Sequence, residues 1–389
     1  MKNFLKLISL FLCFSLFFIP IKANAHRHTA YSHDSNVDLN KQNWMARLSD
    51  SITINELSIP GTGNSMSYGN HTDFSLTQSM DLETQLESGI RFLDLTVDHV
   101  GEFNFRVVTG MVDLGVSVID VLEEVRDFLR NNREETVLVK ISMRNSENGN
   151  FGNYLKRAIE SADLSQYIFD GSKTQNPTLG EVRGKVILLS DYSGNRWKSI
   201  PYNQNTKIQD SNHLNTNWDL YSKWEKVKDH LNKTNKSHSK NIRYVNYLTG
   251  GGGSFPYFVA SGHVSSATDA ARLSTGLTEP GFSGYYKDFP RVNRFGVFAT
   301  IAFEGINTLT YNYILDKELK FVGIVVADFP GAGLIDEIVG LNFPGGGTSS
   351  QGSGGNISSG GGSSSGSSSS GSSGGSNNTD GWGFTYRKG

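Results

Sequence analysis

The sequence predicts the α/β class, with a parallel sheet or a (β/α) barrel at its centre. Strand-like and helix-like runs alternate through the middle of the chain. Between two atypical ends lie roughly 320 residues, a length that one α/β barrel or two smaller domains would fill. The formal net charge is −2. This argues against a nucleic-acid-binding protein that works by bulk positive charge.

Period-two alternation and β-rich runs predict the strands. They are expected at residues 54–59, 91–98, 103–108, 136–141, 185–189, 243–247, 296–302 and 321–327. Helical spacing of apolar residues predicts one helix over 118–129, and a second is expected over 151–162. In such barrels the chemistry lies at the carboxyl ends of the strands, so functional side chains are expected there.

Both ends of the chain differ from the middle. A basic start, an apolar stretch and a small-residue end at Ala23-Asn24-Ala25 predict a secretory signal peptide at residues 1–25. The alternative is a membrane anchor, although the apolar stretch is short for a span of about 20 residues. Cleavage would remove Cys13, the single cysteine. It would also leave 33 of the 36 basic residues against 38 acidic ones, because Lys2, Lys6 and Lys22 are lost.

The expected folded region, residues 26–344, is followed by a segment rich in Gly and Ser at residues 345–378. Its composition offers no apolar face, so we expect a disordered linker. The last residues, 379–389, place Trp382, Phe384 and Tyr386 beside two cations. They would be either a sticky disordered end or an element that touches a membrane, a glycan or a partner.

Polar side chains gather at the expected strand ends. Asp94, Thr96 and Asp98 share one strand face. Lys140, Ser142 and Arg144 share another face on a later strand. Carboxylates that face cations suit a polar or phosphorylated ligand, while the alternative is a solvated rim held by ion pairs.

Eight segments resemble, in order, the X-domain family of bacterial phosphatidylinositol-specific phospholipase C. Among them are "LSIPGTGNS", "QSMDLETQLESGIRFLDLTVD", "GEVRGKVILLSDYSG" and "VGIVVADFP", and together they span about residues 43–342. The resemblance implies a distorted, incomplete TIM barrel with a phospholipase-C-like phosphodiesterase fold. It also implies cleavage of phosphatidylinositol, or of glycosylated anchors, between phosphate and diacylglycerol.

In that family one His acts as base and a second as acid, an Arg stabilises the phosphoryl oxygens, and an Asp orients the first His. Here the two His positions are Gly63 and Thr109, and the Arg position is Thr96. The resemblance keeps Asp94 and Asp328 as catalytic positions. It assigns substrate binding to Asn64 and Asp210, and Lys140 or Arg144 would supply the missing phosphate cation.

A replacement base would have to come from elsewhere, and His71 and His263 are the candidates, each with a solvated loop histidine as the alternative. His99 should point away from the Asp94 face because of the strand alternation. Asn64 and Asp94 retain two ligand types of calcium-dependent relatives, but Thr96 and Ser142 replace two others. We therefore expect no metal and no cofactor.

Two function classes remain open. One is a secreted pseudoenzyme, a monomer that binds inositol phospholipid, a glycosylated anchor or a partner peripherally at a membrane surface. The other is an active phosphodiesterase with relocated catalytic groups or a different substrate. Each catalytic group is typically worth about 10²–10⁴ in rate, so losing three favours the first class.

Overall fold

The computed structural model describes residues 29–343, apart from 70, 102, 145–148, 217–218, 265–290 and 296–297. Between residues 263 and 303 it describes the backbone alone. The expected signal peptide (1–25), linker (345–378) and aromatic end (379–389) lie outside the described residues, as does the side chain of His263. The described residues all fall in one compact unit. No helix within this part of the chain is long and apolar enough to span a bilayer.

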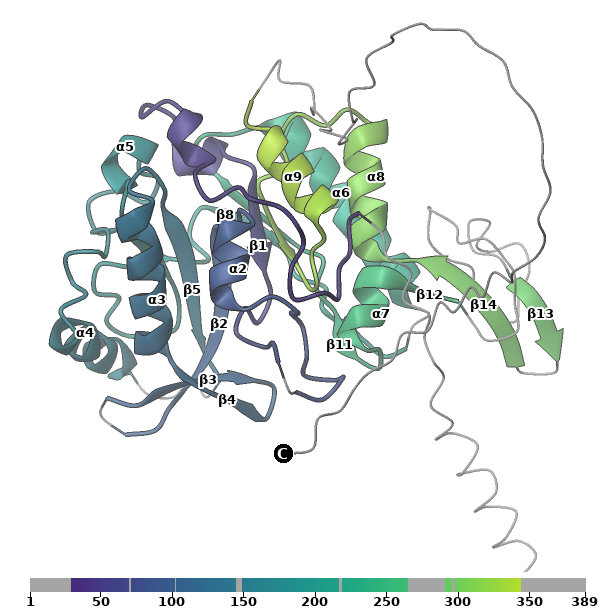
Figure 1. The fold of residues 1–389 in the computed structure, drawn as a ribbon, viewed down its shortest axis with the longest axis horizontal. Coiled ribbons are helices and arrows are strands. Elements are labelled where there is room, and N and C mark those ends of the chain that lie inside the picture. The colour runs from purple at the N-terminus through teal and green to yellow at the C-terminus, as the bar shows by residue number, and fades with distance from the viewer. Residues whose placement is uncertain are drawn as a thin grey trace, which may run out of the picture. The chain divides into compact units, whose positions relative to one another are not determined.

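A curled, mostly parallel sheet forms the centre of the fold (Figure 1). Its main path runs β7-β6-β5-β2-β1-β15-β10-β8. These strands are β1 (Ile59–Thr62), β2 (Phe92–His99), β5 (Val137–Met143), β6 (Val186–Asp191), β7 (Ile200–Pro201), β8 (Thr206–Gln209), β10 (Arg243–Tyr247) and β15 (Ile324–Ala327). The path ends at β7 and β8, which makes the barrel incomplete over the described residues.

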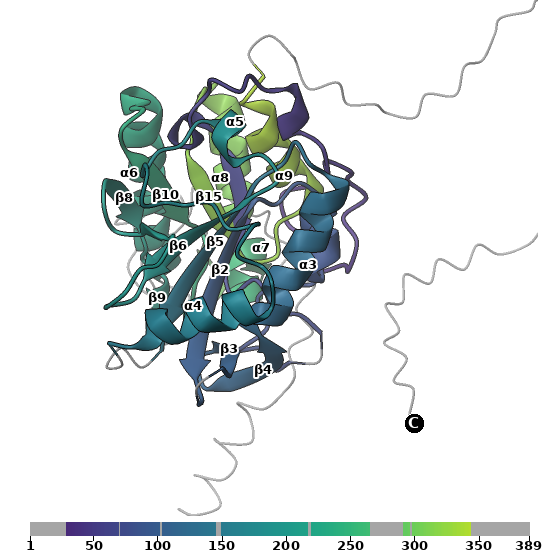
Figure 2. The same cartoon turned by 90° about the vertical axis from the view of Figure 1, so that its left-hand side faces the viewer.

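Helices lie around the outside of the sheet, as Figures 1 and 2 show together. They are α2 (Leu82–Glu87), α3 (Val118–Asn131), α4 (Phe151–Ser161), α5 (Leu179–Val182), α6 (Leu220–Ser237), α7 (Pro256–Ser261), α8 (Ile306–Asp316) and α9 (Ala332–Gly340). Two 3-10 turns, η2 (Met45–Arg47) and η3 (Ile54–Glu56), precede β1. The main hydrophobic core fills the space between the sheet and the helices.

Helix α3 shows how local sequence sets these elements. Ser117 and Asp120 form a capping box, in which the Ser117 hydroxyl accepts from the Asp120 N–H at 3.2 Å. Val118, Val121 and Leu122 then begin the buried face of the helix at the predicted spacing.

The parallel register aligns the rows that carry the polar side chains. Asp94 on β2 pairs with Lys140 on β5, and Thr96 pairs with Ser142 two residues later. Ser142 in turn pairs with Asp191 on β6. The antiparallel hairpin β3 (Phe105–Thr109) and β4 (Val112–Ser117) extends from the carboxyl end of β2.

Two sequence expectations were wrong. Residues 54–56 form η3 instead of a strand, because Thr53 and Glu56 make a capping box that starts a turn, and β1 begins only at Ile59. The expected strand at 296–302 corresponds to β14 (Phe298–Glu304), but β14 lies outside the barrel sheet. It pairs antiparallel with β12 (Gly262–Val264) and β13 (Arg291–Phe295). Two short strands, β9 (His213–Leu214) and β11 (Gly251–Gly252), pair with each other.

Candidate active site

The loop after β1 brings position 63 to the carboxyl end of the sheet. The Gly63 N–H donates to the Ala327 carbonyl at 3.2 Å. The Gly63 carbonyl accepts from the Thr77 hydroxyl at 3.0 Å and from the Gln78 amide at 2.9 Å. Asn64 follows with a φ of 43°, a left-handed conformation that Asn adopts more readily than most residues. The loop is therefore held firmly beside β15, although Gly63 has no side chain to present.

The space that a side chain at position 63 would enter is already filled. A Cβ placed on Gly63 would lie 2.4 Å from the Cγ2 methyl of Thr249, well inside van der Waals contact. It would lie 3.2 Å from Oδ1 of Asp328. Thr249 follows β10 by two residues and is 9 % exposed. The structure thus places Thr249 where a catalytic imidazole would have to start.

Asp328 lies directly after β15 and is 2 % exposed. Its Oδ2 accepts from the Gly250 N–H at 3.2 Å, while its Oδ1 has no hydrogen-bond partner among the described residues. Burial raises the pKa of Asp328 to about 8, since desolvation outweighs the Gly250 N–H and the charge of Lys223. The carboxyl that would orient a histidine is therefore largely protonated near neutral pH.

The backbone after Asp328 is strained. Phe329 has a φ of 46°, which is unfavourable for an aromatic residue. Its N–H donates to the Thr77 carbonyl at 2.9 Å, and the Asn307 amide donates to the Asp328 carbonyl at 2.9 Å. Such strain, held in place by surrounding contacts, is frequent at functional sites.

Lys223 on α6 is a site residue that the sequence analysis missed. It is 2 % exposed, and its ammonium donates to the carbonyls of Ser211 at 3.0 Å and Tyr247 at 3.1 Å. Burial lowers the pKa of Lys223 to about 7, with Asp328 and Asp210 opposing the shift. Its spacing gave a signal, because Lys223 lies three residues after the buried Leu220 and four before the buried Val227, on the same face of the helix.

Asp94 and Lys140 form an ion pair inside the sheet, as their shared register suggested. The Lys140 ammonium lies 3.0 Å from Oδ1 and 3.2 Å from Oδ2 of Asp94. Tyr247 donates to Oδ2 of Asp94 at 2.9 Å, and the hydroxyls of Tyr247 and Tyr202 are 2.9 Å apart. Burial alone would lower the pKa of Lys140. Asp94 and the neighbouring carboxylates outweigh burial and raise it.

Two further carboxylates surround this pair. Oδ2 of Asp191 lies 3.8 Å from the Lys140 ammonium, and its Oδ1 accepts from Asn203 at 3.0 Å. Asp210 is exposed, and partial burial together with Asp94 and Asp191 raises the pKa of Asp210 against the pull of Lys140. The cluster formed by Asp94, Asp191, Asp210 and Lys140 holds more carboxylates than cations, and we call it the acidic cluster.

The other candidate residues lie near the acidic cluster but add no acid, base or free cation to it. Thr96 pairs with Val108 on β3, and Thr109 is the next residue, so both replaced positions lie at the same end of neighbouring strands. Arg144 donates to the Gly110 carbonyl at 2.7 Å and pairs with Asp98. Arg144 is therefore engaged with the hairpin, whereas Lys140 is engaged with Asp94.

The histidines give little support for a relocated base. His71 is half-buried in the loop after β1. His99 stacks on Phe105, with ring centroids 5.0 Å apart, and lies 4.9 Å from Tyr154 of α4, away from Asp94 as the alternation predicted. Within the described ranges no group of three or more His, Cys, Asp or Glu side chains is arranged to hold a metal ion.

Comparison with known proteins shows which proteins this chain is similar to. Residues 51–192 match the family described as phosphatidylinositol-specific phospholipase C, X domain. A 1-phosphatidylinositol phosphodiesterase from Listeria monocytogenes is 32% identical over 201 residues, which is 49% of this chain and 62% of the relative. The match thus covers less than two thirds of that relative's length. A Staphylococcus aureus protein of the same name is 27% identical over 260 residues, 59% of this chain and 81% of the relative.

Solved structures agree on the fold. The phosphatidylinositol-specific phospholipase C from L. monocytogenes superposes with a TM-score of 0.58 at 22% identity, covering 78% of this chain and 99% of that one. The enzyme from S. aureus gives 0.56 at 21% identity, covering 77% and 97%. At this level of identity they show the fold alone, and they confirm the expected distorted, incomplete TIM barrel.

Proposed function

We propose a binding function for this chain, whose residues 51–192 match the X domain of phosphatidylinositol-specific phospholipase C. It is a secreted, monomeric protein that binds an inositol-containing head group at a membrane surface. It does not hydrolyse that head group by the two-histidine mechanism. The relatives from L. monocytogenes and S. aureus carry the name 1-phosphatidylinositol phosphodiesterase, which supports the ligand class.

The contact between Thr249 and position 63 carries the proposal. A general base must lie within about 2.6–3.2 Å of the proton that it removes. The Thr249 methyl occupies the space beside Oδ1 of Asp328, so a side chain on Gly63 has no room to reach the reacting hydroxyl. Thr109 carries an alcohol, which is too weak an acid to replace an imidazolium at neutral pH.

The acidic cluster suits the hydroxyl groups of a polyol. Carboxylates accept hydrogen bonds from hydroxyls, and Asp210 and Asp191 are the accessible members of the cluster. The excess of carboxylates over Lys140 disfavours close approach of a phosphodiester. Binding through the inositol ring is therefore favoured over binding through the phosphate, and the same ring occurs in glycosylated anchors.

Aromatic residues on loops at the same end, one of them exposed, support contact with a lipid surface. Phe74, in the loop after β1, is 67 % exposed. Its ring centroid lies 4.4 Å from that of Phe255, which precedes α7 and stacks at 5.3 Å on Tyr257. Aromatic side chains of this kind favour the membrane interface. A related phosphatidylinositol-specific phospholipase C from S. aureus binds membranes, and this binding can be modulated.

Co-sedimentation with vesicles tests the binding proposal. We expect the chain to bind phosphatidylinositol vesicles, with free inositol as a competitor, and to leave the lipid intact. Asp210→Ala should weaken binding, while Asp38→Ala, at an exposed position distant in sequence, should not. Equal binding to vesicles with and without phosphatidylinositol would contradict an inositol-binding role.

Secretion rests on residues 1–25, and it has its own test. Expression with the full N-terminus in a secreting bacterial host should yield extracellular protein that begins at His26. Protein that stays in the membrane with residues 1–25 attached would favour the membrane-anchor alternative.

One observation favours the competing function, an active phosphodiesterase with relocated groups. Burial brings the pKa of Asp328 to about 8 and that of Lys223 to about 7, close to the range that acid–base catalysis needs. An activity that disappears in Asp328→Asn and Lys223→Met, with a pH profile that reports both groups, would establish this alternative.

A further inference from the structure

A buried arginine at the amino-terminal end of the sheet has no acidic partner among the residues that the structure describes. Arg243 is the first residue of β10 and is 4 % exposed. It shares a strand face with Tyr247, whose hydroxyl reaches Asp94 inside the sheet, so Arg243 projects into the interior at the opposite end.

The guanidinium of Arg243 makes few contacts. Its Nη2 donates to the Gln175 carbonyl at 3.2 Å, and its Nη1 lies 3.5 Å from the Thr206 hydroxyl. Its Nε has no hydrogen-bond partner among the residues that the structure describes. Burial lowers the pKa of Arg243 to about 10, and Tyr202 is the single ionisable neighbour that opposes the shift. The side chain therefore remains charged at neutral pH.

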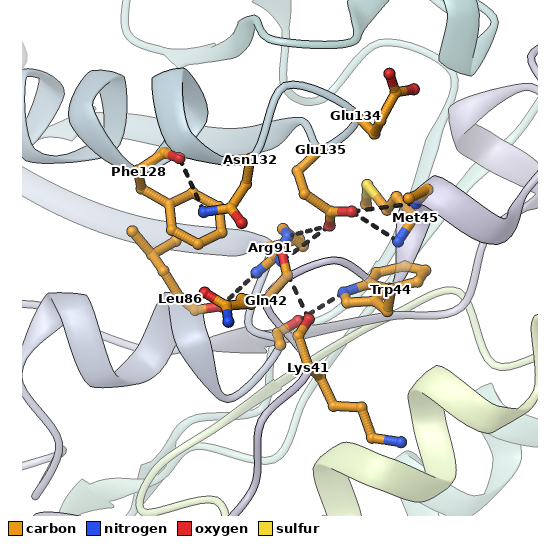
Figure 3. A network of polar contacts seen from close by, with 12 residues as sticks. Lys41, Gln42, Trp44, Met45, Leu86, Arg91, Phe128, Asn132, Glu134 and Glu135 are labelled. Carbon is orange, nitrogen blue, oxygen red and sulfur yellow. Dashed lines mark hydrogen bonds and ion pairs between the residues drawn. The ribbon is translucent and has the colours of Figure 1, made fainter.

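Arg91, another buried arginine of the same chain, shows what a satisfied guanidinium looks like (Figure 3). It is fully buried, its Nε donates to Glu135 at 2.9 Å, and its Nη2 lies 2.8 Å from the same carboxylate. Its Nη1 donates to the carbonyls of Leu86 and Ile90, and Nη2 donates to those of Lys41 and Gln42. Every side of Arg91 thus faces an acceptor, whereas Arg243 lacks both the carboxylate and a partner for Nε.

A cavity of about 260 Å³ lies beside Arg243. Six of its eight lining residues are asparagine or glutamine, among them Asn55, Asn205 and Asn241. Oδ1 of Asn55, a residue 6 % exposed, is also buried without a donor in the described structure. The cavity is therefore lined by a buried cation and by neutral amides, and two polar atoms in its wall lack partners in the described structure.

The neighbouring acid does not neutralise Arg243. Glu56 follows Asn55 in the chain, and its carboxylate lies 2.8 Å from the Lys240 ammonium. The Lys240 carbonyl is occupied as well, because it accepts from Asn176 at 2.6 Å. Burying a charge without a counter-ion is costly, and arginine does not escape the cost by losing its proton.

We propose that this cavity, which we call the basal cavity, binds a small organic oxyanion that carries hydroxyl groups, such as a sugar acid or a sugar phosphate. A carboxylate or phosphate balances the buried guanidinium of Arg243, which lines the cavity and lacks a counter-ion among the described residues. The hydroxyl groups bond to the surrounding amides. The volume suits a single sugar-sized ligand, since drug-sized ligands occupy about 300–1,000 Å³.

Calorimetry on the full chain, at constant ionic strength, tests this site with glucuronate, glucose 6-phosphate, inorganic phosphate and uncharged glucose. We expect one-to-one binding of glucuronate or glucose 6-phosphate, at least about tenfold tighter than that of glucose. Stronger binding of inorganic phosphate than of both sugar anions would overturn the assignment to a sugar-like ligand.

Two variants weaken the attraction of the cavity for an anion in different ways. Arg243→Met deletes the cation, and Asn241→Asp adds a like charge at an exposed position on the cavity rim. Each should weaken binding by about tenfold or more. If Arg243→Met does not fold, Asn241→Asp decides the matter. Asn104→Asp, an equally exposed change in the loop between β2 and β3 at the other end, should leave binding unchanged.

Absence of saturable binding up to about 10 mM of every probe would refute the proposal, as would binding that both variants leave intact. The inference does not depend on the proposed function at the carboxyl end of the sheet. Vesicle binding should be the same for wild type and Asn241→Asp, so a failure of either idea can be recognised separately.

Discussion

Adding a single methyl group at position 63 tests whether Thr249 fills the site. In Gly63→Ala the new Cβ would lie 2.4 Å from the Thr249 methyl, and no φ restriction applies at Gly63. Overpacking of this kind typically costs about 1–3 kcal/mol. The opposing gain from a stiffer unfolded chain is only about 0.4–1 kcal/mol. We therefore expect a net loss of about 1–2 kcal/mol in the free energy of unfolding.

The clash should disappear when its partner is trimmed. Thr249→Ser removes the methyl, after which the nearest remaining atom of residue 249 is Cβ, at 3.5 Å. Thr249→Ser alone should cost about 1 kcal/mol, the value of one buried methyl group. The double variant should then be no less stable than Thr249→Ser, which gives a favourable coupling of about 1–2 kcal/mol.

Urea unfolding followed by tryptophan fluorescence measures all four proteins of this cycle. Gly149→Ala is the matched control, because a Cβ there meets none of the described residues within 4 Å and φ is unrestricted. It should be neutral or slightly stabilising. A neutral Gly63→Ala, or effects of the two changes that add within about 0.5 kcal/mol, would refute the claim that Thr249 fills this space.

Three further predictions concern the buried acid, the ion pair and the tail. Burial raises the pKa of Asp328 to about 8, so the folded state keeps a proton that the unfolded state releases above about pH 4. The contribution of this group to the free energy of unfolding therefore falls as the pH rises from about 4 to 8. The stability of wild type relative to Asp328→Asn should therefore decline between pH 5 and 8 in urea unfolding by up to about 1.4 kcal/mol per pH unit, and a constant difference would contradict the shift. Lys140→Met leaves Asp94 buried without its cation and should cost about 3 kcal/mol, whereas Lys140→Met with Asp94→Asn should cost less than the sum of the single changes. Deleting everything after Pro344 should leave the thermal midpoint unchanged by calorimetry, and a drop of several degrees would show that the tail docks; loss of vesicle retention alone, shared in part by Trp382→Ala, would identify an attachment element.

The strands that the sequence predicted well are those with a clear pattern and two buried faces. Residues 243–247 were expected as a strand, and β10 has the same bounds, because all five residues are buried between the two layers. The first strand was misplaced since Thr53 and Glu56 compete locally for a helical turn. The role of β14 could not be predicted, because strand propensity does not specify which sheet a strand joins.

The sequence predicted the row of polar side chains in the candidate site. It did not predict which side chains pack into the space around Gly63 or which groups pair with Arg144. Alternation placed carboxylates and cations on the strand faces, as expected, while the pairing of Asp94 with Lys140 followed from a register that the sequence does not specify. Gly63 and Thr249 are far apart in the chain, and no local sequence pattern predicts their contact. Arg144 shares the face of Lys140 in sequence, but the hairpin carbonyl of Gly110 and the carboxylate of Asp98 engage it.

The release of cyclic inositol phosphate from phosphatidylinositol micelles tests the central claim most directly. Phosphorus NMR with wild type should show no product above a buffer control, because Gly63, Thr96 and Thr109 supply neither acid, base nor cation. Restoring Gly63→His, Thr96→Arg and Thr109→His should yield activity only when Thr249→Gly is added, since Thr249 otherwise blocks the new imidazole. Wild-type turnover at even a thousandth of a typical rate of about 10 s⁻¹ would contradict the account.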